Sequence, residues 1–423
     1  MKIKKDGHYA WTIMAAAILM KIGAGALMAS TGNFITPIVQ DLGISATAFS
    51  SIVSIEAVGM ALFYTTAAKY LTEKKIGLVM GIAYMAEAIG VGLMSVYTKA
   101  WMFYLSAAVI GVSQAFTGYV AFPILINMWF KKDAGSVLGT IMAVSSAAGV
   151  VFGQLSAMLI VGTGWRLAYI VLAVLGFAFT VPVALRLIKS PQEVGCNAYG
   201  EGELLANDGS SGIKAANESW GLTRKEAFAQ LAFWLAWGTC LCYSLGSGGS
   251  GYITSFLTLE LGQTITYAAR VGLFSSIGGI LSSIILGRIN DKYGVKAGLV
   301  YGAVCVISGT AILLLSYSNP LFSIPAAFII GLGGSMYTVQ APLIARNVIG
   351  EKYYSDVWSV MMVANSLIGG GLYSSWALFY DIGGSFKGTF IFSATFFILA
   401  IVMGFTAVNL SQKYKPHHTA TEE

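Results

Sequence analysis

Three ionisable side chains, Lys21, Glu56 and Glu87, lie within long apolar runs of the sequence. An ionisable group inside a membrane-spanning segment is costly and is therefore a candidate functional group. A buried lysine can bind a carboxylate, and a buried glutamate can take up and release a proton. We predict that Lys21 is the cationic contact for a carboxylate substrate, that Glu56 is its resting partner, and that Glu56 and Glu87 are the proton-coupling groups. The alternative is a structural Lys21–Glu56 or Lys21–Glu87 pair that fixes helix packing.

These three residues share one depth in the runs that contain them. Lys21 is about 11 residues into its run from the N-terminal side, Glu56 about 10 residues from the opposite side, and Glu87 about 11. At 1.5 Å per residue this is roughly 16 Å, near the middle of a hydrocarbon core about 30 Å thick. The sequence therefore predicts a common depth for the three side chains, but it does not predict contact between them.

Polar and aromatic residues in other apolar runs are candidates for orienting a ligand. A few such groups fix the position of a molecule in an otherwise apolar pocket. Besides Lys21 and Glu56, the residues that we predict to contact substrate are Gln114, Tyr119, Gln154, Tyr243, Tyr337, Asn365 and Tyr373. The tyrosines favour a substrate with apolar or aromatic parts. For each of these residues, the alternative role is a hydrogen bond between helices.

The composition indicates that the bilayer surrounds most of the chain. Of 423 residues, 56% are hydrophobic and only 10% are charged, and the mean hydropathy is +0.73. A soluble domain has about 25% charged residues, so this chain has too few polar side chains to cover a surface of that size. The net charge of +6 comes from short basic clusters between apolar runs, which does not indicate nucleic-acid binding.

Twelve runs are long enough to cross a membrane, for which about 20 apolar residues are needed. We predict spans near 10–36, 46–68, 76–97, 101–126, 136–161, 166–188, 230–257, 267–288, 297–317, 320–345, 356–379 and 386–409. Four glycines within residues 246–251 weaken the seventh span as a helix, which predicts a kink that lines a cavity. Close packing of small residues is the alternative there.

The positions of Lys and Arg predict the orientation of the spans. Of the 25 Lys and Arg residues, 20 fall on the side of the N-terminus, 4 fall on the other side, and Lys21 lies within a span. Basic residues accumulate in cytoplasmic loops. We therefore expect a multi-pass protein of the plasma (inner) membrane with both termini in the cytoplasm.

A polar segment divides the chain into two sets of six spans. Residues 189–228 are rich in Gly, Ser and Asn, which is typical of a linker. We predict an N-terminal six-helix bundle at 1–188, a cytoplasmic linker at 189–228, and a C-terminal six-helix bundle with a short tail at 229–423. Two parallel halves of this kind place a binding site between them.

One loop carries a family resemblance. Residues 287–296 read Gly-Arg-Ile-Asn-Asp-Lys-Tyr-Gly-Val-Lys, which resembles the G-x-x-x-D-[RK]-x-G-x-[RK] signature of major facilitator transporters. The resemblance implies an all-α membrane protein of twelve transmembrane helices, arranged as two six-helix bundles with pseudo-two-fold symmetry. It also implies a cytoplasmic gate, formed by Gly287, Asp291, Lys292, Gly294 and Lys296. The equivalent loop at residues 68–75 is a degraded copy, with Thr72 in place of the acidic residue.

Further segments narrow the resemblance. Residues 127–130 read Asn-Met-Trp-Phe and are followed by Gly135 and Gly139, which is similar to the oxalate/formate antiporter and monocarboxylate porter branch. Residues 190–195, 233–234 and 380–386 are similar to the same branch. The oxalate antiporter holds its dianion with an Arg in the eighth span and a Lys in the eleventh. Here Ser283 and Met362 stand at those positions, so we do not expect oxalate exchange. One central cation, Lys21, suits a substrate with one carboxylate better than one with two.

We therefore expect a secondary active transporter for a small organic anion, a monocarboxylate, that works as a monomer by proton symport or exchange. The alternatives are proton-coupled efflux of neutral or amphipathic compounds and, more remotely, a membrane sensor without transport. No His falls within a span, and the four cysteines show neither disulfide nor zinc spacing. We expect no enzymatic activity, no cofactor, no metal site and no nucleic-acid partner.

Overall fold

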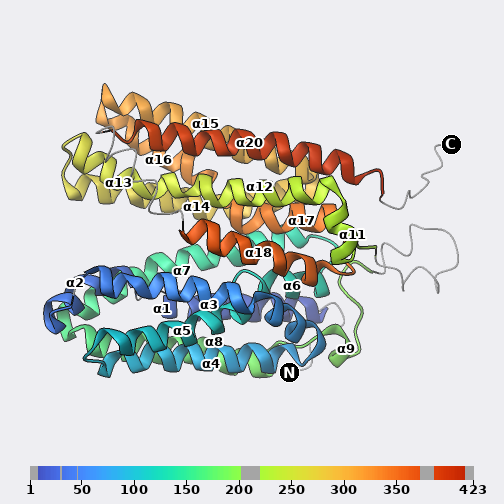
Figure 1. Ribbon diagram of the computed structural model, residues 1–423, viewed down its shortest axis with the longest axis horizontal. Helices are drawn as coiled ribbons and strands as arrows, with labels where there is room; N and C mark the ends of the chain where they lie inside the picture. The colour runs from blue at the N-terminus through green and yellow to red at the C-terminus, as the bar shows by residue number, and fades with distance from the viewer. Residues whose placement is uncertain (1–7, 29–30, 45, 202–219, 372–384, 415–423) are drawn as a thin grey trace, which may run out of the picture.

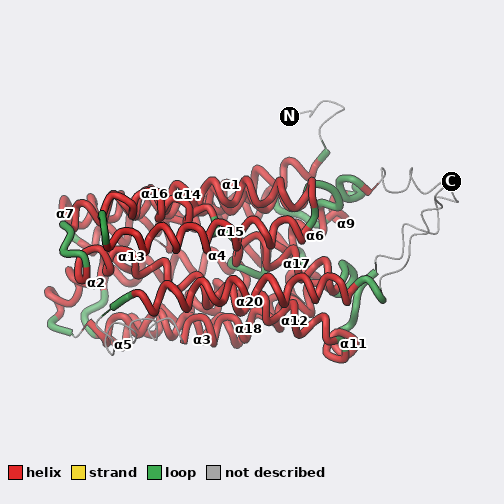
Figure 2. The backbone as a smooth tube through the Cα atoms, turned by 90° about the horizontal axis from the view of Figure 1, so that it is seen from above, coloured by secondary structure: helices red, strands yellow, loops and turns green. Residues whose placement is uncertain are grey.

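The computed structural model describes residues 8–28, 31–44, 46–201, 220–371 and 385–414, and nearly all of this part is helical. Most helices run along the long axis of the molecule (Figures 1 and 2). The helices fall into two sets in chain order. The first set comprises α1 (Tyr9–Met28), α2 (Thr31–Leu42), α3 (Ala46–Glu73), α4 (Ile76–Leu93), α5 (Ala100–Thr117), α6 (Ala121–Trp129), α7 (Ala134–Thr163) and α8 (Trp165–Leu187). The second comprises α12 (Leu231–Gly248), α13 (Ile253–Ser255), α14 (Ile265–Tyr293), α15 (Val295–Leu314), α16 (Ser323–Leu332), α17 (Ala341–Ile349), α18 (Tyr354–Gly371) and α20 (Lys387–Ser411).

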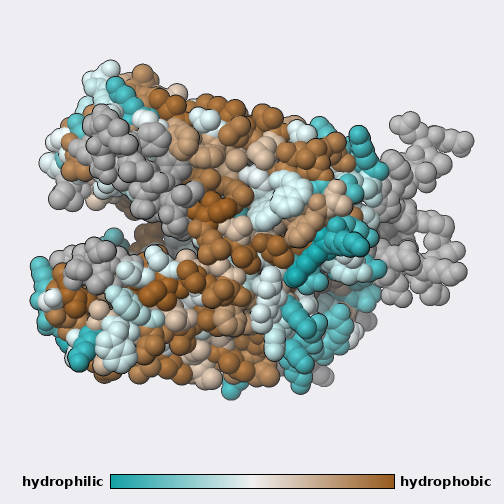
Figure 3. Space-filling model, viewed as in Figure 1, coloured by the Kyte–Doolittle hydropathy of each residue, from teal (hydrophilic) through white to brown (hydrophobic). Residues whose placement is uncertain are grey.

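Ten helical segments in the described part of the chain are long and apolar enough to cross a membrane. They correspond to ten of the twelve predicted spans. The helices α12 and α18 occupy the other two, and α18 is described only as far as Gly371. Apolar residues cover the middle of the molecule in Figure 3, whereas hydrophilic residues gather toward the end that carries the termini. We call this the termini end. The prediction of an all-α, multi-pass membrane protein is confirmed.

The two sets of helices lie one above the other in Figure 1, and in the described part of the chain their most extensive contacts are those of α7 with α14 and of α3 with α18. The α7–α14 contact is close because glycines face it. A Cβ atom added to Gly139 would lie 2.1 Å from the Ser283 carbonyl oxygen, and one added to Gly287 would lie 2.3 Å from that of Gly135. Small residues allow such backbone approach where lipid supplies no hydrophobic force between helices.

Three predicted spans are interrupted helices. The fourth span divides at residues 118–120 into α5 and α6, and the tenth divides at residues 333–335 between α16 and a π-helical turn, Met336–Gln340. The seventh span is α-helical through Gly248, continues as a 3-10 turn and ends in a π-helical turn, Phe256–Glu260. Irregular backbone at membrane depth is tolerated where it lines a cavity. The breaks in the fourth and tenth spans were not predicted.

The short helices lie near the termini end, beside the segment between the two sets (Figure 1). They are α9 (Pro191–Val194) and α11 (Arg224–Ala229), and each begins with a capping box. An isolated β-bridge joins Gly221 to Gly350 and another joins Phe130 to Tyr199. These contacts attach the two described ends of the predicted linker to the helices, while residues 202–219 lie outside the described part.

The glycine contact between α7 and α14 leads to a stability prediction. Gly139→Ala should lower the thermal unfolding midpoint, because the added methyl group would meet the α14 backbone; overpacking of this kind costs about 1–3 kcal/mol. Gly149→Ala in the same helix is the matched control, because nothing lies within 4 Å of a Cβ atom there. It should be neutral or stabilising, by up to about 1 kcal/mol from helix propensity. Thermal unfolding in detergent checks both, and equal midpoints would contradict the close contact.

Candidate binding cavity

A cavity of about 200 Å³ lies between the two sets of helices and contains Lys21 and Glu87. Its lining comes mainly from the first set, with Thr338 added from the second. The residues that line it are Lys21, Ala24, Met28, Met60, Tyr84, Glu87, Gln114, Thr117, Gly118, Tyr119, Met142, Ser145, Ser146 and Thr338. The break in the fourth span lies at its wall, because Thr117 ends α5 and Tyr119 falls in the interruption. The cavity thus combines one amine, one carboxylate and several neutral polar groups.

Lys21 is held in the middle of α1 and is only 8% exposed. Its Nζ lies 4.1 Å from the centre of the Phe122 ring, a distance at which a cation is attracted to the ring face. Within the described residues, no hydrogen bond or ion pair connects its ammonium group to an acidic side chain. The Glu87 carboxylate attracts it through space. The amine is therefore buried, oriented and not neutralised by direct contact.

Glu87 projects from α4 and is 2% exposed. The Thr117 hydroxyl donates a hydrogen bond of 3.2 Å to its Oε2, and the Gln114 side chain also interacts with the carboxylate. Tyr84 supports this arrangement by donating to the Thr117 carbonyl oxygen over 3.3 Å. A buried carboxylate retains its charge at lower cost when such donors surround it.

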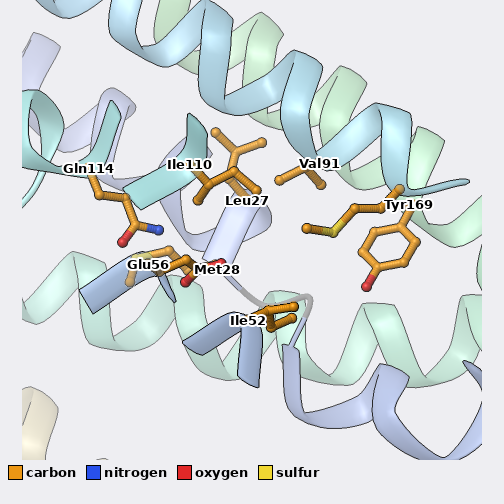
Figure 4. Close-up of a pocket in the computed structure, with 9 residues that line it drawn as sticks. Leu27, Met28, Ile52, Glu56, Val91, Ile110, Gln114 and Tyr169 are labelled. Carbon is orange, nitrogen blue, oxygen red and sulfur yellow. The ribbon is translucent and has the colours of Figure 1, made fainter. Parts of the chain in front are cut away.

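Glu56 lies in a separate pocket of about 50 Å³. Figure 4 shows Glu56 and Gln114 close together at one end of this pocket and Tyr169 at the other. Gln114 and Met28 also line the Lys21 cavity, so the two spaces are neighbours. The predicted Lys21–Glu56 pair is not present among the described residues; the carboxylate that shares the cavity with Lys21 is Glu87. The physical reason is that Glu56 faces α5, where its backbone packs against Gly111.

The other predicted contact residues divide into two groups. Gln114 and Tyr119 line the Lys21 cavity, and the Tyr119 ring makes an edge-to-face contact with Tyr337, with ring centres 5.4 Å apart. The Asn365 amide is 1% exposed and lies beside Tyr337. Neither of its amide atoms makes a well-formed hydrogen bond within the described chain. Tyr119, Tyr337 and Asn365 thus form a polar and aromatic group where the two sets of helices meet.

Three predicted contact residues do not belong to this group. Tyr243 is buried against Phe397 inside the second set, with ring centres 5.7 Å apart. Gln154 is exposed on α7 and lines neither the Lys21 cavity nor the Glu56 pocket. Tyr373 lies outside the described residues. Tyr243 and Gln154 were selected for their type within apolar runs, which does not show the direction in which a helix turns them.

A second cavity, of about 150 Å³, was not predicted, and we call it the serine-rich cavity. It is lined by Ser146, Ser250, Ser275, Gly279, Ile330, Gly331, Gly334, Ser335 and Thr338. It meets the Lys21 cavity at Ser146 and Thr338, which line both. The signal in the sequence was the accumulation of serine and glycine in the fifth, seventh, eighth and tenth spans.

The termini end is closed by contacts between the two sets of helices. Asp291 accepts hydrogen bonds from the backbone N–H groups of Gly135 at 2.9 Å and Ser136 at 2.6 Å. These groups are at the N-terminus of α7, where the helix dipole favours a negative charge. Gly287 lies at the close contact with α7, and Gly294 ends α14 with a positive φ of 79°.

The two lysines of the predicted gate, Lys292 and Lys296, make contacts within the second set of helices. Lys296 donates to Asn409 Oδ1 over 2.6 Å, and Lys292 lies over the Tyr293 ring at 5.0 Å. In the degraded copy of the loop, the Thr72 hydroxyl donates to carbonyl oxygens of its own helix, at Ala68 and Lys69.

A second closing contact, which we call the Glu351 latch, consists of Lys131, Arg346 and Glu351. Lys131 belongs to the first set, and the Glu351 carboxylate pairs with both it and Arg346. Arg346 also donates to the Phe130 carbonyl oxygen over 3.2 Å. Burial alone would raise the pKa of the Glu351 carboxyl, but Arg346 and Lys131 outweigh burial and hold the pKa below its ordinary value of 4.5. The opposite end shows a hollow between the two sets (Figure 3).

Residues 17–374 match the Major Facilitator Superfamily. The chain belongs to this family. Its solved structures confirm the fold: the transporter FucP in the outward conformation has a TM-score of 0.69 at 11% identity, covering 95% of this chain and 99% of that one. The proton:xylose symporter XylE has a TM-score of 0.66 at 13% identity, covering 96% of both chains. The family and the fold are those of carriers that typically lack enzymatic activity.

Proteins that are similar in sequence share more identity with this chain than these two structures do. The probable transporter MCH2 of Saccharomyces cerevisiae is 23% identical over 86% of this chain and 74% of its own length. The gallate transporter of Pseudomonas putida is 24% identical over 82% of this chain and 79% of its own length. The membrane sensor protein UhpC of Salmonella typhimurium is 22% identical over 60% of this chain and 58% of its own length.

The Glu351 latch predicts how the termini end responds to substitution. Glu351→Gln should increase amide hydrogen exchange of residues 127–136 and 346–356 by at least about tenfold, because a hydrogen bond to a charged group contributes about 1.5–3 kcal/mol. Glu226→Gln is the control, since Glu226 caps α11 at the same end and accepts hydrogen bonds from Thr223.

The same experiment has a pH dependence. A carboxyl whose pKa is lowered on folding stabilises the folded arrangement above its unfolded pKa, and this contribution is lost as the pH falls through the folded pKa. The difference in amide hydrogen exchange between the parent and Glu351→Gln should therefore be largest at pH 7 and should shrink below about pH 4.5. A difference that does not change with pH, or an equal effect of Glu226→Gln, would contradict the latch.

Proposed function

We propose that this protein is a secondary active transporter that moves a small organic anion, a monocarboxylate, by alternating access between two six-helix bundles, in proton symport or exchange. The observation that carries the proposal is the buried Lys21 ammonium, which lines the cavity between the two sets of helices without a direct ion pair among the described residues. A buried ammonium group has lost hydration by water. A bound carboxylate would supply the opposite charge and the hydrogen-bond acceptors that replace this water.

The number of cations favours one carboxylate over two. In the described lining of the Lys21 cavity and the adjoining serine-rich cavity, Lys21 is the single basic side chain. Ser283, at the position where the oxalate antiporter has an arginine, shares a hydrogen bond of 2.6 Å with Ser335. Met362 accepts a weak contact from the Tyr337 hydroxyl at 3.9 Å. Neither position can neutralise a second carboxylate, which supports the monocarboxylate porter branch.

Proton coupling is assigned mainly to Glu87. A substrate carboxylate at Lys21 would place a second negative charge near Glu87, and like charges in a buried site favour protonation of one of them. Substrate binding would thus favour proton uptake by Glu87, and the two would cross together. Glu56, which adjoins the same space through Gln114, is the candidate for passing the proton on. The alternative role for Glu56 and Glu87, in efflux of neutral or amphipathic compounds, requires no role for Lys21.

Two similar proteins support this substrate class and coupling. The Pseudomonas putida relative is named for gallate, which is an aromatic carboxylate. The structural neighbour XylE is named as a proton symporter. Two further relatives are named as the membrane sensor protein UhpC. The experiment below therefore also tests whether this protein is a sensor.

The proposed placement in the plasma (inner) membrane has the termini end in the cytoplasm. The basic loops lie at that end, as the positive-inside rule requires. With the termini end closed by Asp291 and the Glu351 latch, the hollow in Figure 3 faces outward. We further propose that residues 189–228 are the linker between bundles and that one chain suffices for transport.

Uptake into proteoliposomes tests the proposed function. Lys21→Met, which keeps the length of the side chain and removes its charge, should lower saturable uptake of labelled monocarboxylates by at least about tenfold, because a charged hydrogen bond contributes about 1.5–3 kcal/mol. Lys69→Met, at the exposed end of α3, should transport as the parent does. Uptake that is unchanged in Lys21→Met, or transport of neutral compounds alone, would overturn the proposal in favour of efflux. Binding without any transport would favour a sensor.

Substitution of the two carboxylates tests the coupling. Glu87→Gln should abolish acceleration of uptake by an inward proton gradient but retain exchange of labelled for unlabelled substrate, because exchange needs no net proton movement. Glu56→Gln should slow gradient-driven uptake and retain some stimulation. Full gradient dependence in Glu87→Gln would exclude Glu87 as the coupling group. Protein content and the thermal unfolding midpoint of each variant control for misfolding.

A further inference from the structure

The serine-rich cavity adjoins the Lys21 cavity and belongs mainly to the second set of helices. It takes Ser250 from the seventh span, Ser275 from α14 and Ser335 from the interruption of the tenth span. Ser146 and Thr338 line both cavities. A molecule bound to Lys21 that extends past these two residues would therefore place its far end among hydroxyl groups.

Most of these hydroxyl groups lie within hydrogen-bond distance of a backbone carbonyl oxygen earlier in their own span. Ser146 donates to the Met142 carbonyl oxygen over 3.1 Å, Ser250 donates to the Ser247 carbonyl oxygen over 2.7 Å, and Thr338 donates to the Ser335 carbonyl oxygen over 3.4 Å. A hydroxyl group carries one donor and two acceptor lone pairs. These three side chains therefore offer acceptors to the cavity.

Ser335 extends the same pattern. It is 4% exposed, and its hydroxyl shares one hydrogen bond with Ser283 and another, of 3.2 Å, with the Gly279 carbonyl oxygen. Ser275 is the lining hydroxyl that keeps its proton free of a partner within the described chain. The lining is thus rich in acceptors, poor in donors and, among described residues, without a basic side chain.

A second observation shows that a ligand is expected in this space. Lys21, more than nine-tenths buried, lines the adjoining cavity and has no direct hydrogen bond or ion pair among the described residues. The two adjoining cavities thus offer a cation in one and hydrogen-bond acceptors in the other. A molecule that reached both would contact each with a different group.

We propose that the serine-rich cavity is a specificity subsite that accepts hydrogen bonds from hydroxyl groups of the substrate, so that the transported anion is a hydroxylated monocarboxylate. This rests on the proposed function and deepens it. A substrate hydroxyl would donate to Ser250, Ser335 or Thr338. A second carboxylate has acceptors alone, and among these lone pairs it would lose its hydration and gain at most the Ser275 hydroxyl as a donor. An unsubstituted acid would leave the buried acceptors unpaired, which sites of this kind reject strongly.

The test compares acids that differ only at the end remote from the carboxylate. One series is benzoate, 4-hydroxybenzoate and terephthalate, and a shorter one is butyrate, 4-hydroxybutyrate and succinate. Uptake of each labelled acid into proteoliposomes gives kcat/KM for the parent protein. In at least one series, we expect the hydroxylated acid to exceed the unsubstituted one by at least about tenfold and the dicarboxylate to be the poorest.

Matched variants assign this preference to the cavity. In the double variant Ser250→Ala, Ser335→Ala, the ratio of kcat/KM for the hydroxylated acid to that for the unsubstituted acid should fall to within about threefold. Ser308→Ala on α15 is the control, because its hydroxyl also donates to its own helix, at the Val304 carbonyl oxygen, but does not line this cavity. It should keep the parental preference.

The outcomes separate the two proposals. Transport of monocarboxylates with no preference for the hydroxylated acid, preference for the dicarboxylate, or a preference that survives the double variant would overturn the subsite and leave the proposed function standing. Lys21-independent uptake, or no uptake of any of the six acids, would overturn the proposed function itself. If the double variant fails to fold, as its thermal midpoint would show, Ser250→Ala and Ser335→Ala are measured singly, with the same loss of preference expected.

Discussion

The contact between α7 and α14 is the constraint on which the internal cavity depends. Glycines bring the two backbones together near the termini end, and Asp291 accepts hydrogen bonds there from the first residues of α7. Closure at this end leaves the helices free to diverge toward the other end, where the hollow lies. Since lipid does not drive apolar helices together, such short backbone contacts and a charged cap must carry much of the association.

The two adjoining cavities differ in the charged groups that line them. The first set of helices supplies an ammonium and a carboxylate, Lys21 and Glu87, whereas the second supplies hydroxyl groups. A molecule that contacts both sides would connect the two sets, so its binding energy depends on how they are arranged. A ligand shifts a conformational equilibrium only through such differential contacts. The interrupted fourth and tenth spans lie at this boundary, where backbone groups freed from regular helix face polar space instead of lipid.

Span positions were predictable because hydropathy reports burial in lipid directly. The predicted span at 136–161 corresponds to α7, Ala134–Thr163, and the depth of Lys21 followed from simple counting. The interruption at Gly118 was not predictable, because the apolar run continues through it without a change in composition. Nor was the partner of Lys21: depth follows from position along a helix, but contact depends on the direction of the side chain around it. Glu87 rather than Glu56 shares the cavity because α3 turns Glu56 toward α5.

The two halves of the molecule also differ at the termini end, in a way that the sequence partly shows. The gate loop at 287–296 keeps its acidic residue, whereas the copy at 68–75 has Thr72, which bonds within its own helix. The Glu351 latch supplies charge pairing between the sets elsewhere at the same end, with residues that no repeated motif identifies. Opening of this end therefore has to break one helix cap and one partly buried charge cluster together. Because packed interfaces between helices tend to have discrete arrangements, the proposed alternating access would switch these contacts as a group.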